Sequence, residues 1–285
     1  MSTNKGNIIS ELRREAGYTQ KTLADALHVT DKAVSKWERG ICQPDSSLLP
    51  KLSLLLDADI ELLLHTKVTK DDEWIGLLDL QKWDVDLSEK VYDKPMVYFM
   101  LSHFLLLDIR DIYVRTSKKN EEFLSQKLFE DLGFTFTFDF GSLPKCNVMV
   151  LNRPLFLFGS DLTRQFQGAM ATRSLVKLVP VNQGPTFLFC PTEYAFMYLK
   201  NPDYLYETAS DKTLGRGMVS VELDSSDNIY DAGGFVRFYQ NNSDLLIGSL
   251  EEIAFRKGII DKDKFMELAC ETHYFDRLKS IAETR

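Results

Sequence analysis

The chain has 285 residues, enough for two hydrophobic cores, and its 44% hydrophobic and 12% aromatic content is that of an ordinary globular protein. Its formal net charge of −8 is unevenly placed: residues 1–67 carry nine basic and nine acidic side chains, and the remaining 25 basic and 33 acidic ones supply the whole deficit. An acidic surface repels phosphate, which excludes the larger part of the chain from general nucleic-acid binding and leaves only a local basic face near the N-terminus.

Within the first 66 residues, apolar side chains recur at the three- and four-residue spacing that is typical of helices. They predict five short helices, with apolar positions at Ile8, Ile9 and Leu12; Leu23, Ala24 and Leu27; Val34 and Trp37; Leu48, Leu49, Leu52, Leu55 and Leu56; and Ile60, Leu62, Leu63 and Leu64. The second and third helices are separated only by a short break around Val29, which predicts a helix-turn-helix.

The third predicted helix leaves a row of polar side chains on its outer face, and a helix is narrow enough to enter the major groove of DNA. These side chains are Asp31, Lys32, Ser35, Lys36 and Arg39. We expect Lys32 to donate to guanine, and Lys36 and Arg39 to bind phosphate. Asp31 has two interpretations, as an acceptor from cytosine or as a charge that favours the helix N-terminus.

This pattern resembles the lambda-repressor-like (Xre-type) DNA-binding family over about residues 5–66. The matching elements are Thr19-Gln20, Leu23-Ala24, Leu27, Val29-Thr30, Val34-Ser35 and Trp37-Glu38-Arg39-Gly40. The resemblance implies that Gln20 holds a phosphate and braces the recognition helix, which Thr30 is suited to cap. The residues predicted to bind DNA are Gln20, Thr30, Asp31, Lys32, Ser35, Lys36 and Arg39. The alternative is a helical interaction bundle that has lost DNA binding.

Residues 67–73 are mostly polar or charged, and we interpret them as a linker. Beyond them, β-rich runs alternate with helical stretches, which is typical of a mostly parallel sheet with helices on its faces. Strands are predicted at 74–80, 112–114, 134–138, 147–151, 155–158, 186–189 and 218–221. Helices are predicted at 95–107, 121–132, 161–170, 192–199 and 231–240, and the chain from residue 250 reads as wholly helical.

The four cysteines lie far apart and form no CxxC pair, which predicts buried free thiols in a reducing cytosol. The chain opens with no recognisable signal peptide. Its most apolar stretch, residues 96–109, is too short and too polar to cross a bilayer, so we interpret it as a core helix. These features predict a cytoplasmic protein that does not bind membranes.

Two blocks of the larger region resemble sugar-1-phosphate nucleotidylyltransferases, above all the glucose-1-phosphate thymidylyltransferase group. The first block is residues 91–98, VYDKPMVY, continuing through 106–112, and the second lies within residues 214–260 and includes the run IGSLEEIAFRKGII. The resemblance implies a Rossmann-like nucleotidyltransferase-type domain with a mixed or parallel sheet and a helical C-terminus. A plainer interpretation of residues 92–95 is a turn that caps the following helix.

The groups that this chemistry requires are missing from the positions where the resemblance places them. Gly76 is the lone glycine near the first strand, so no GxGTR-like loop exists to cradle phosphates. The family's loop lysine falls on Asp86, and its first metal-binding aspartate falls within residues 152–154, which contain no carboxylate. If residues 214–217, LGRG, set the register, the second metal-binding aspartate falls on Glu222, with Asp224 nearby. The Glu-Lys-Pro segment that holds the sugar phosphate has no counterpart.

Binding can outlast catalysis, because the thymidylyltransferase group also has a regulatory nucleotide-sugar site. The resemblance maps residues of that site onto Gly159, Glu252, Ile253 and Arg256. Arginine offers a fork to phosphate, and glycine permits close approach of the backbone. The alternative is that Glu252 and Arg256, four residues apart, form a routine pair on a helix surface.

The sequence therefore predicts an α plus α/β protein: a five-helix helix-turn-helix domain at 1–66, a linker at 67–73, and a degenerate sugar-nucleotidyltransferase-like domain at 74–285. We expect a sequence-specific transcription regulator that binds double-stranded DNA as a homodimer or higher homo-oligomer. The larger domain would be an inactive relative of these enzymes and would hold no metal or cofactor. Its role would be to dimerise the protein or to sense a nucleotide or nucleotide-sugar. The alternatives are a bifunctional nucleotidylyltransferase fused to a DNA-binding domain, and a scaffold with neither activity.

Overall fold

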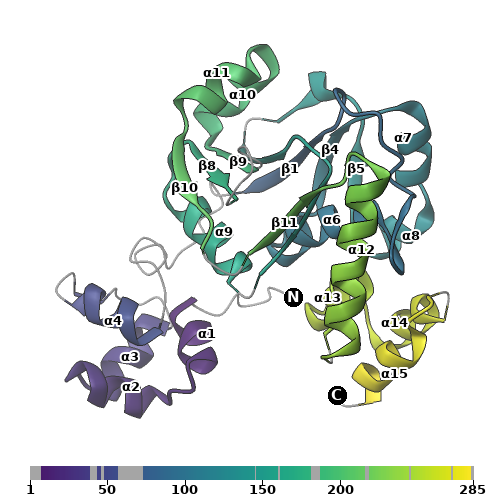
Figure 1. The fold of residues 1–285 in the computed structure, drawn as a ribbon. Coiled ribbons are helices and arrows are strands. Elements are labelled where there is room, and N and C mark those ends of the chain that lie inside the picture. The colour runs from purple at the N-terminus through teal and green to yellow at the C-terminus, as the bar shows by residue number, and fades with distance from the viewer. Residues whose placement is uncertain are drawn as a thin grey trace. The chain divides into compact units, whose positions relative to one another are not determined.

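The computed structural model describes residues 8–38, 44–45, 48–56, 73–144, 146–159, 161–180, 187–215, 218–243, 245–270 and 272–283. The chain divides into two compact units (Figure 1). The first unit comprises residues 1–73 with 164–173, and the second comprises residues 74–163 with 174–285. No helix in the described ranges is long and apolar enough to cross a membrane.

The N-terminal helices of the first unit enclose a small apolar core. They are α1 (Ile8–Glu15), α2 (Gln20–Leu27), α3 (Asp31–Glu38) and α4 (Leu49–Leu56). The buried core contains Ile9, Leu12, Leu23, Ala24, Leu27, Val34, Trp37, Leu49, Leu52 and Leu56. These are positions that the helical spacing predicted, so the first four helices are confirmed. The predicted fifth helix, at residues 60–64, lies outside the described residues.

The turn of the helix-turn-helix is fixed by local hydrogen bonds. Thr19 opens α2 with a reciprocal cap, in which its hydroxyl accepts from the Thr22 backbone N–H at 3.0 Å and its own N–H donates to the Thr22 hydroxyl at 2.8 Å. His28 ends α2 in the left-handed conformation, with φ of 58°. This cap turns the chain so that α3 begins three residues later.

The second unit is built on a seven-stranded mixed sheet, whose strands follow the order β10-β8-β9-β6-β1-β4-β5 (Figure 1). The strands are β1 (Trp74–Asp79), β4 (Asp111–Arg115), β5 (Thr135–Thr137), β6 (Asn147–Leu151), β8 (Val176–Val179), β9 (Phe187–Cys190) and β10 (Ser210–Thr213). Strands β5, β4, β1 and β6 are parallel, β9 runs antiparallel between β6 and β8, and β10 is parallel to β8.

Two short antiparallel ribbons accompany this sheet. One pairs β7 (Leu155–Phe158) with β11 (Val219–Glu222), and the other pairs β2 (Lys90–Val91) with β3 (Lys94–Pro95). The predicted strand at 155–158 is therefore confirmed, although it joins a ribbon rather than the main sheet. The register of the larger ribbon places Glu222 opposite Leu155.

Helices account for most of the remaining described chain of the second unit. They are α6 (Met96–Leu106), α7 (Lys118–Leu124), α8 (Lys127–Asp131), α10 (Thr192–Lys200), α11 (Pro202–Thr208), α12 (Ser226–Asn241), α13 (Leu250–Arg256), α14 (Lys262–Ala269) and α15 (Phe275–Glu283), with a 3-10 turn at Phe140–Ser142. Helix α9 (Leu162–Ala171) follows β7 in the chain. The single helix predicted at 121–132 is wrong, because Ser125 ends α7 and its hydroxyl donates to the Glu121 carbonyl at 2.7 Å.

Helix α6 is the predicted core helix, and ten of its eleven residues are buried. It packs directly on β1 at Gly76, where an added Cβ would lie 2.5 Å from Ile112 Cδ1 and 3.0 Å from Phe104 Cδ1. The lone glycine of the first strand therefore serves helix–sheet packing.

A buried polar cluster ties the start of α6 to the helical C-terminal region. The Lys94 side chain is fully buried, and its ammonium donates to both carboxylate oxygens of Asp93 at 2.9 Å and to Gln240 Oε1 at 3.1 Å. It also lies 4.1 Å from the centre of the Tyr274 ring. Asp93 is therefore an ion-pair partner, and α6 has no side-chain cap, so the helix-capping interpretation of residues 92–95 is wrong.

Glu251 extends the same cluster within α13. Its carboxylate accepts from the Tyr98 hydroxyl at 3.1 Å, from Tyr274 at 2.9 Å and from Ser249 at 3.0 Å. Burial raises the pKa of the Tyr274 hydroxyl, and the neighbouring carboxylate adds to that shift. The cluster joins segments from both ends of the second unit through fully hydrogen-bonded charges.

Candidate functional sites

The outer face of α3 presents the polar row that the sequence predicted. Asp31, Lys32 and Lys36 are exposed, and Ser35 is half-buried. Thr30 precedes the helix, and its hydroxyl accepts from the Ala33 backbone N–H at 3.2 Å, which confirms it as the N-cap. The Asp31 carboxylate accepts from the Lys32 N–H at 2.8 Å.

The same helix is braced from behind by a polar cluster of three residues. Glu38, the last residue of α3, accepts from Arg13 Nε at 2.5 Å and from Gln20 Nε2 at 2.7 Å. Arg13 also donates to the Tyr18 carbonyl at 2.6 Å. The bracing role expected for Gln20 is confirmed by this contact, whereas the phosphate contact remains a prediction. Arg39 lies outside the described residues.

Charge within this brace makes the first unit sensitive to acid. Burial by itself raises the pKa of Glu38, but hydrogen bonds from Arg13 and Gln20, with the charge of Arg13, outweigh it and hold the pKa below the ordinary value of 4.5. The folded unit thus binds this proton less readily than the unfolded chain. Its contribution to stability is complete above that ordinary value and is lost as the pH falls through the lower, folded value.

We therefore expect Glu38→Gln to destabilise the first unit by about 1–3 kcal/mol at neutral pH, because it removes the charge from buried hydrogen bonds. We also expect the stability of the variant to fall less between pH 5 and 3 than that of the native chain. Amide hydrogen exchange of peptides from α2 and α3, corrected for intrinsic rates, measures both effects. Asp25→Asn, at an exposed carboxylate of α2, is the matched control. An equal acid dependence in native chain and Glu38→Gln would contradict the assignment.

In the second unit, the carboxyl ends of the parallel strands are where open α/β sheets bind ligands. Here the last residues of β1 and β4, Asp79 and Arg115, form an ion pair. Asp79 is buried and accepts from both Arg115 Nε, at 2.9 Å, and the Arg115 terminal nitrogen, while the Tyr198 hydroxyl donates to it at 3.0 Å. A paired carboxylate therefore stands where a phosphate-binding loop would begin.

This ion pair was not among the predicted site residues. Asp79 ends the apolar run IGLLD, and a carboxylate closing a buried strand was the signal available in the sequence. Its partners come from 36 and 119 positions away in the chain, and no local pattern points to them.

The ends of β6 and β11 form a second ion pair nearby in the fold. Arg153 follows β6, and its terminal nitrogen lies 3.2 Å from the Glu222 carboxylate at the end of β11. The guanidinium also lies 6.0 Å from the centre of the Trp83 ring, and the indole N–H of Trp83 donates to the Asn152 carbonyl at 2.8 Å. The segment 152–154, within which the resemblance placed one metal-binding aspartate, thus meets Glu222, onto which it mapped the other.

The residues at this place do not fit a divalent cation. Magnesium takes oxygen ligands, usually carboxylates, whereas one of the two positions carries a permanently charged guanidinium. Over the described ranges of the chain, no group of three or more His, Cys, Asp or Glu side chains is arranged to hold a metal. We therefore derive no chemistry through a metal at this site.

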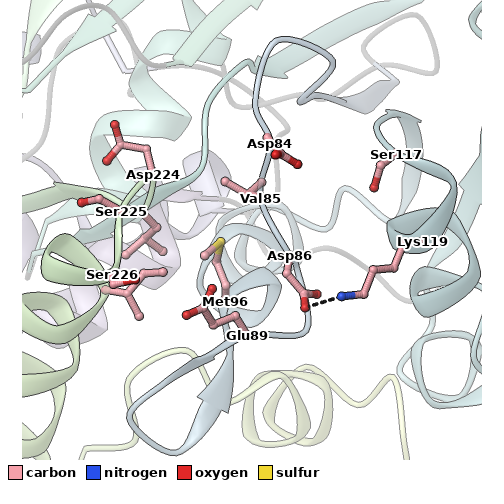
Figure 2. Close-up of a pocket in the computed structure, with 12 residues that line it drawn as sticks. Asp84, Val85, Asp86, Glu89, Met96, Ser117, Lys119, Asp224, Ser225 and Ser226 are labelled. Carbon is pink, nitrogen blue, oxygen red and sulfur yellow. Dashed lines mark hydrogen bonds and ion pairs between the residues drawn. The ribbon is translucent and has the colours of Figure 1, made fainter.

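A pocket of about 370 Å³ lies beside these strand ends (Figure 2). Its lining includes four carboxylates, Asp84, Asp86, Glu89 and Asp224, and among the described lining residues Lys119 supplies the one ammonium group. Figure 2 shows Asp86 and Lys119 pointing toward one another, and they form an ion pair at 2.7 Å. The hydrogen bond from Lys119 is the largest cause that lowers the pKa of Asp86. The pocket therefore keeps an excess of three negative charges, which disfavours a triphosphate.

The four residues mapped to a nucleotide-sugar site make internal contacts. Arg256 Nε donates to Glu252 Oε1 at 2.6 Å, one turn apart on α13, and Ile253 between them is half-buried. Gly159 has its open side filled, because an added Cβ would lie 1.9 Å from the Met218 sulfur. Ligand binding by these residues stays a prediction.

Comparison with known proteins agrees with both resemblances. Residues 9–63 match the family model HTH_3, described as helix-turn-helix. The chain is 38% identical over 69 residues to the HTH-type transcriptional regulator ImmR of Bacillus subtilis (strain 168), a match that covers 24% of this chain and 54% of that protein. The predicted helix-turn-helix class of the first unit is thereby confirmed.

The C-terminal region is similar to glucose-1-phosphate thymidylyltransferases. The chain is 25% identical over 243 residues to that enzyme of Neisseria meningitidis serogroup A, a match that covers 63% of this chain and 84% of the enzyme. A solved structure described as a glucose-1-phosphate thymidylyltransferase of Bacillus anthracis covers 58% of this chain and 96% of its own, with 12% identity and a TM-score of 0.45. The sequence match alone therefore carries the similarity of the C-terminal region to these enzymes.

Proposed function

We propose that this protein is a sequence-specific DNA-binding transcription regulator whose larger unit is a catalytically inactive nucleotidyltransferase relative that dimerises it. The observation that carries the proposal is the outer face of α3, where Lys32 and Lys36 are exposed on a capped and braced helix. A rigid helix with exposed donors on one face is what reading the major groove requires.

The inactivity of the larger unit is inferred from charge. Phosphoryl-type transfer needs cations that offset the charge of a triphosphate and a loop that positions it. The corresponding places hold the Asp79–Arg115 pair, the Arg153–Glu222 pair and a pocket with Asp86 on its wall. In the two pairs the arginine is already bound to a carboxylate of the chain, and in the pocket the carboxylates repel phosphate.

Dimerisation follows from what one helix-turn-helix can offer. A single domain makes few phosphate contacts, and dimers of such domains bind two half-sites one helical turn apart. The first unit is electrically neutral over residues 1–67, so two copies on one DNA molecule are needed for useful affinity. Sedimentation equilibrium of the full chain should therefore give twice the monomer mass of 32.7 kDa.

The test of DNA binding is selection of fragments from the source genome by the full-length protein, followed by mobility shift of the selected fragments. We expect one or a few fragments to be retained, including DNA upstream of its own gene, and a two-fold symmetric footprint. Retention of all fragments alike at low salt, or of none, would overturn the proposal of sequence-specific regulation.

A bifunctional enzyme is the alternative, and a direct assay separates it from the proposal. The full-length protein is incubated with dTTP, Mg²⁺ and glucose 1-phosphate, and pyrophosphate release is measured. We expect no release above background. Release that is abolished by Glu222→Gln would overturn the assignment of an inactive unit and leave the assignment of DNA binding intact.

Sensing of a nucleotide-sugar at α13 is the remaining function considered for the larger unit. If Glu252 and Arg256 bind such a ligand, a dTDP-sugar should raise the melting temperature of the native chain but not that of Arg256→Ala. If they form only a surface pair, that substitution changes stability by at most about 1 kcal/mol and no ligand shift is seen. Thermal denaturation with and without dTDP-glucose distinguishes the two results.

A further inference from the structure

The Arg153–Glu222 pair has a geometry that is fixed by the backbone. Glu222 lies opposite Leu155 in the β7–β11 ladder, and the Leu223 N–H donates to the Pro154 carbonyl at 2.7 Å. These contacts hold the residue before Pro154 close to the end of β11. The meeting of Arg153 and Glu222 is thus a consequence of strand register, and any side chain at position 153 would start from the same place.

The guanidinium is held from a second side as well. Trp83 lies beside it at 6.0 Å from ring centre to Cζ, and the Trp83 N–H binds the carbonyl of the preceding residue, Asn152, at 2.8 Å. The side chains of Arg153 and Glu222 are 21% and 25% exposed, so water screens their attraction only in part. Arg153 Nε and Glu222 Oε1 are both buried with no hydrogen-bond partner among the described residues, so the 3.2 Å contact between Arg153 and Glu222 acts through charge.

We propose that the Arg153 guanidinium is the resident cation of this site and takes the place that a divalent metal would otherwise share with Glu222. A guanidinium keeps its proton at any pH that the folded protein meets, so the positive charge is permanent. It neutralises the Glu222 carboxylate, and it repels a second cation brought to the same oxygen atoms. The site has its cation built into the chain and is independent of metal supply.

An arginine at position 153 has a different effect on metal binding than a neutral residue would have. Substitution of a metal-binding aspartate by a neutral residue would leave Glu222 able to bind a metal weakly, whereas an arginine reverses the charge of that position. The single change Arg153→Asp should therefore create a metal site by placing two carboxylates at adjoining strand ends. The inference concerns the cation alone and does not depend on the assignment of DNA binding.

The experiment is a titration of Mn²⁺ against the full-length protein, followed by electron paramagnetic resonance of the free ion. We expect Arg153→Asp to bind one Mn²⁺ at least about tenfold more tightly than the native chain, because the local charge changes by two units. Arg153→Gln, which removes the cation without adding an oxygen anion, should bind less tightly than Arg153→Asp. Adding Glu222→Gln to Arg153→Asp should abolish the gain.

Two results would overturn the proposal. One is equal Mn²⁺ affinity in folded native chain and folded Arg153→Asp, with folding checked by circular dichroism. The other is binding of Mn²⁺ by the native chain, with Arg153 in place, that is lost in Glu222→Gln. That result would show that Glu222 already holds a metal. Loss of DNA binding in the earlier assay would contradict the proposed function and leave this result standing. Mg²⁺-dependent pyrophosphate release that is lost in Glu222→Gln would contradict both.

Discussion

Lys94→Met is expected to lower the free energy of unfolding of the larger unit by about 3–5 kcal/mol, because it leaves a carboxylate without its partner in the protein interior. Asp93 loses both of its 2.9 Å hydrogen bonds to the ammonium, and Gln240 loses one at 3.1 Å. Burial lowers the pKa of Lys94, although the charge of Asp93 opposes that shift. The ion pair thus repays the cost of burying the ammonium only in part.

Because the attraction to Asp93 offsets the desolvation of Lys94 only in part, removing both charges should cost less than removing one. The double variant Lys94→Met with Asp93→Asn should be more stable than Lys94→Met alone, because the lone buried charge is gone and Gln240 Nε2, which donates to Asp93 Oδ2 at 2.9 Å, can still donate to the amide oxygen. Urea unfolding, followed by fluorescence of the tryptophans and by circular dichroism, measures these changes.

Lys118→Ala provides the matched control. Its side chain is 80% exposed and pairs with Glu121 one turn away, so its removal should cost at most about 1 kcal/mol. A loss as small for Lys94→Met as for Lys118→Ala would show that the buried cluster does not hold the C-terminal helices to α6. A double variant less stable than Lys94→Met would contradict the argument from the unpaired carboxylate.

The combined variant Lys32→Ala and Lys36→Ala should reduce affinity for the selected DNA by about a hundredfold, since contacts of this type contribute roughly 1–3 kcal/mol each. The loss should have two components. Lys32 is expected to read a base, so its removal should relax sequence preference, whereas removal of Lys36, a phosphate contact, should lower the salt dependence of binding. Fluorescence anisotropy over a range of salt concentrations separates the two.

The control for this prediction removes the same charge from the larger unit. Lys118 and Lys279 are exposed on α7 and α15, and their joint replacement by alanine should leave DNA affinity within about twofold. Neither Lys32 nor Lys36 belongs to the core of the first unit, so the native melting temperature is expected in their variant. Equal losses in both double variants would mean that net charge, not the α3 face, determines binding.

The four described N-terminal helices, α1 to α4, could be predicted from the sequence almost residue by residue. Its core positions, such as Leu23, Leu27, Val34 and Trp37, recur at helical spacing, and a helix is held by contacts three and four residues apart. The N-cap at Thr30 is a property of the residue and of its immediate neighbours in the chain. The exposed polar residues of α3 follow from the same periodicity, since they are what the core leaves outside.

In the second unit, the longer apolar strands could be predicted and the edges could not. Strands β8 and β10 and helix α11 were missed. For β10 the reason is that its sequence, SDKT, is polar and largely exposed, so it is a strand only by pairing with β8. The main sheet is mixed and mostly parallel, as predicted, and β9 is the strand that runs antiparallel to its neighbours. Strand direction at that place depends on neighbours that are distant in the chain.

The sequence by itself determined the helix-turn-helix class of the N-terminal helices, the exposed polar row of α3 and the lack of a GxGTR-like run after the first strand, because each depends on residues close together in the chain. Only the tertiary structure decided which charges meet at the strand ends: Asp79 with Arg115, and Arg153 with Glu222. Likewise, it brought Lys94 to Gln240 across 146 residues. Ion pairs act over a few ångströms of space, so they are specified by strand register and helix packing, which the one-dimensional pattern does not contain.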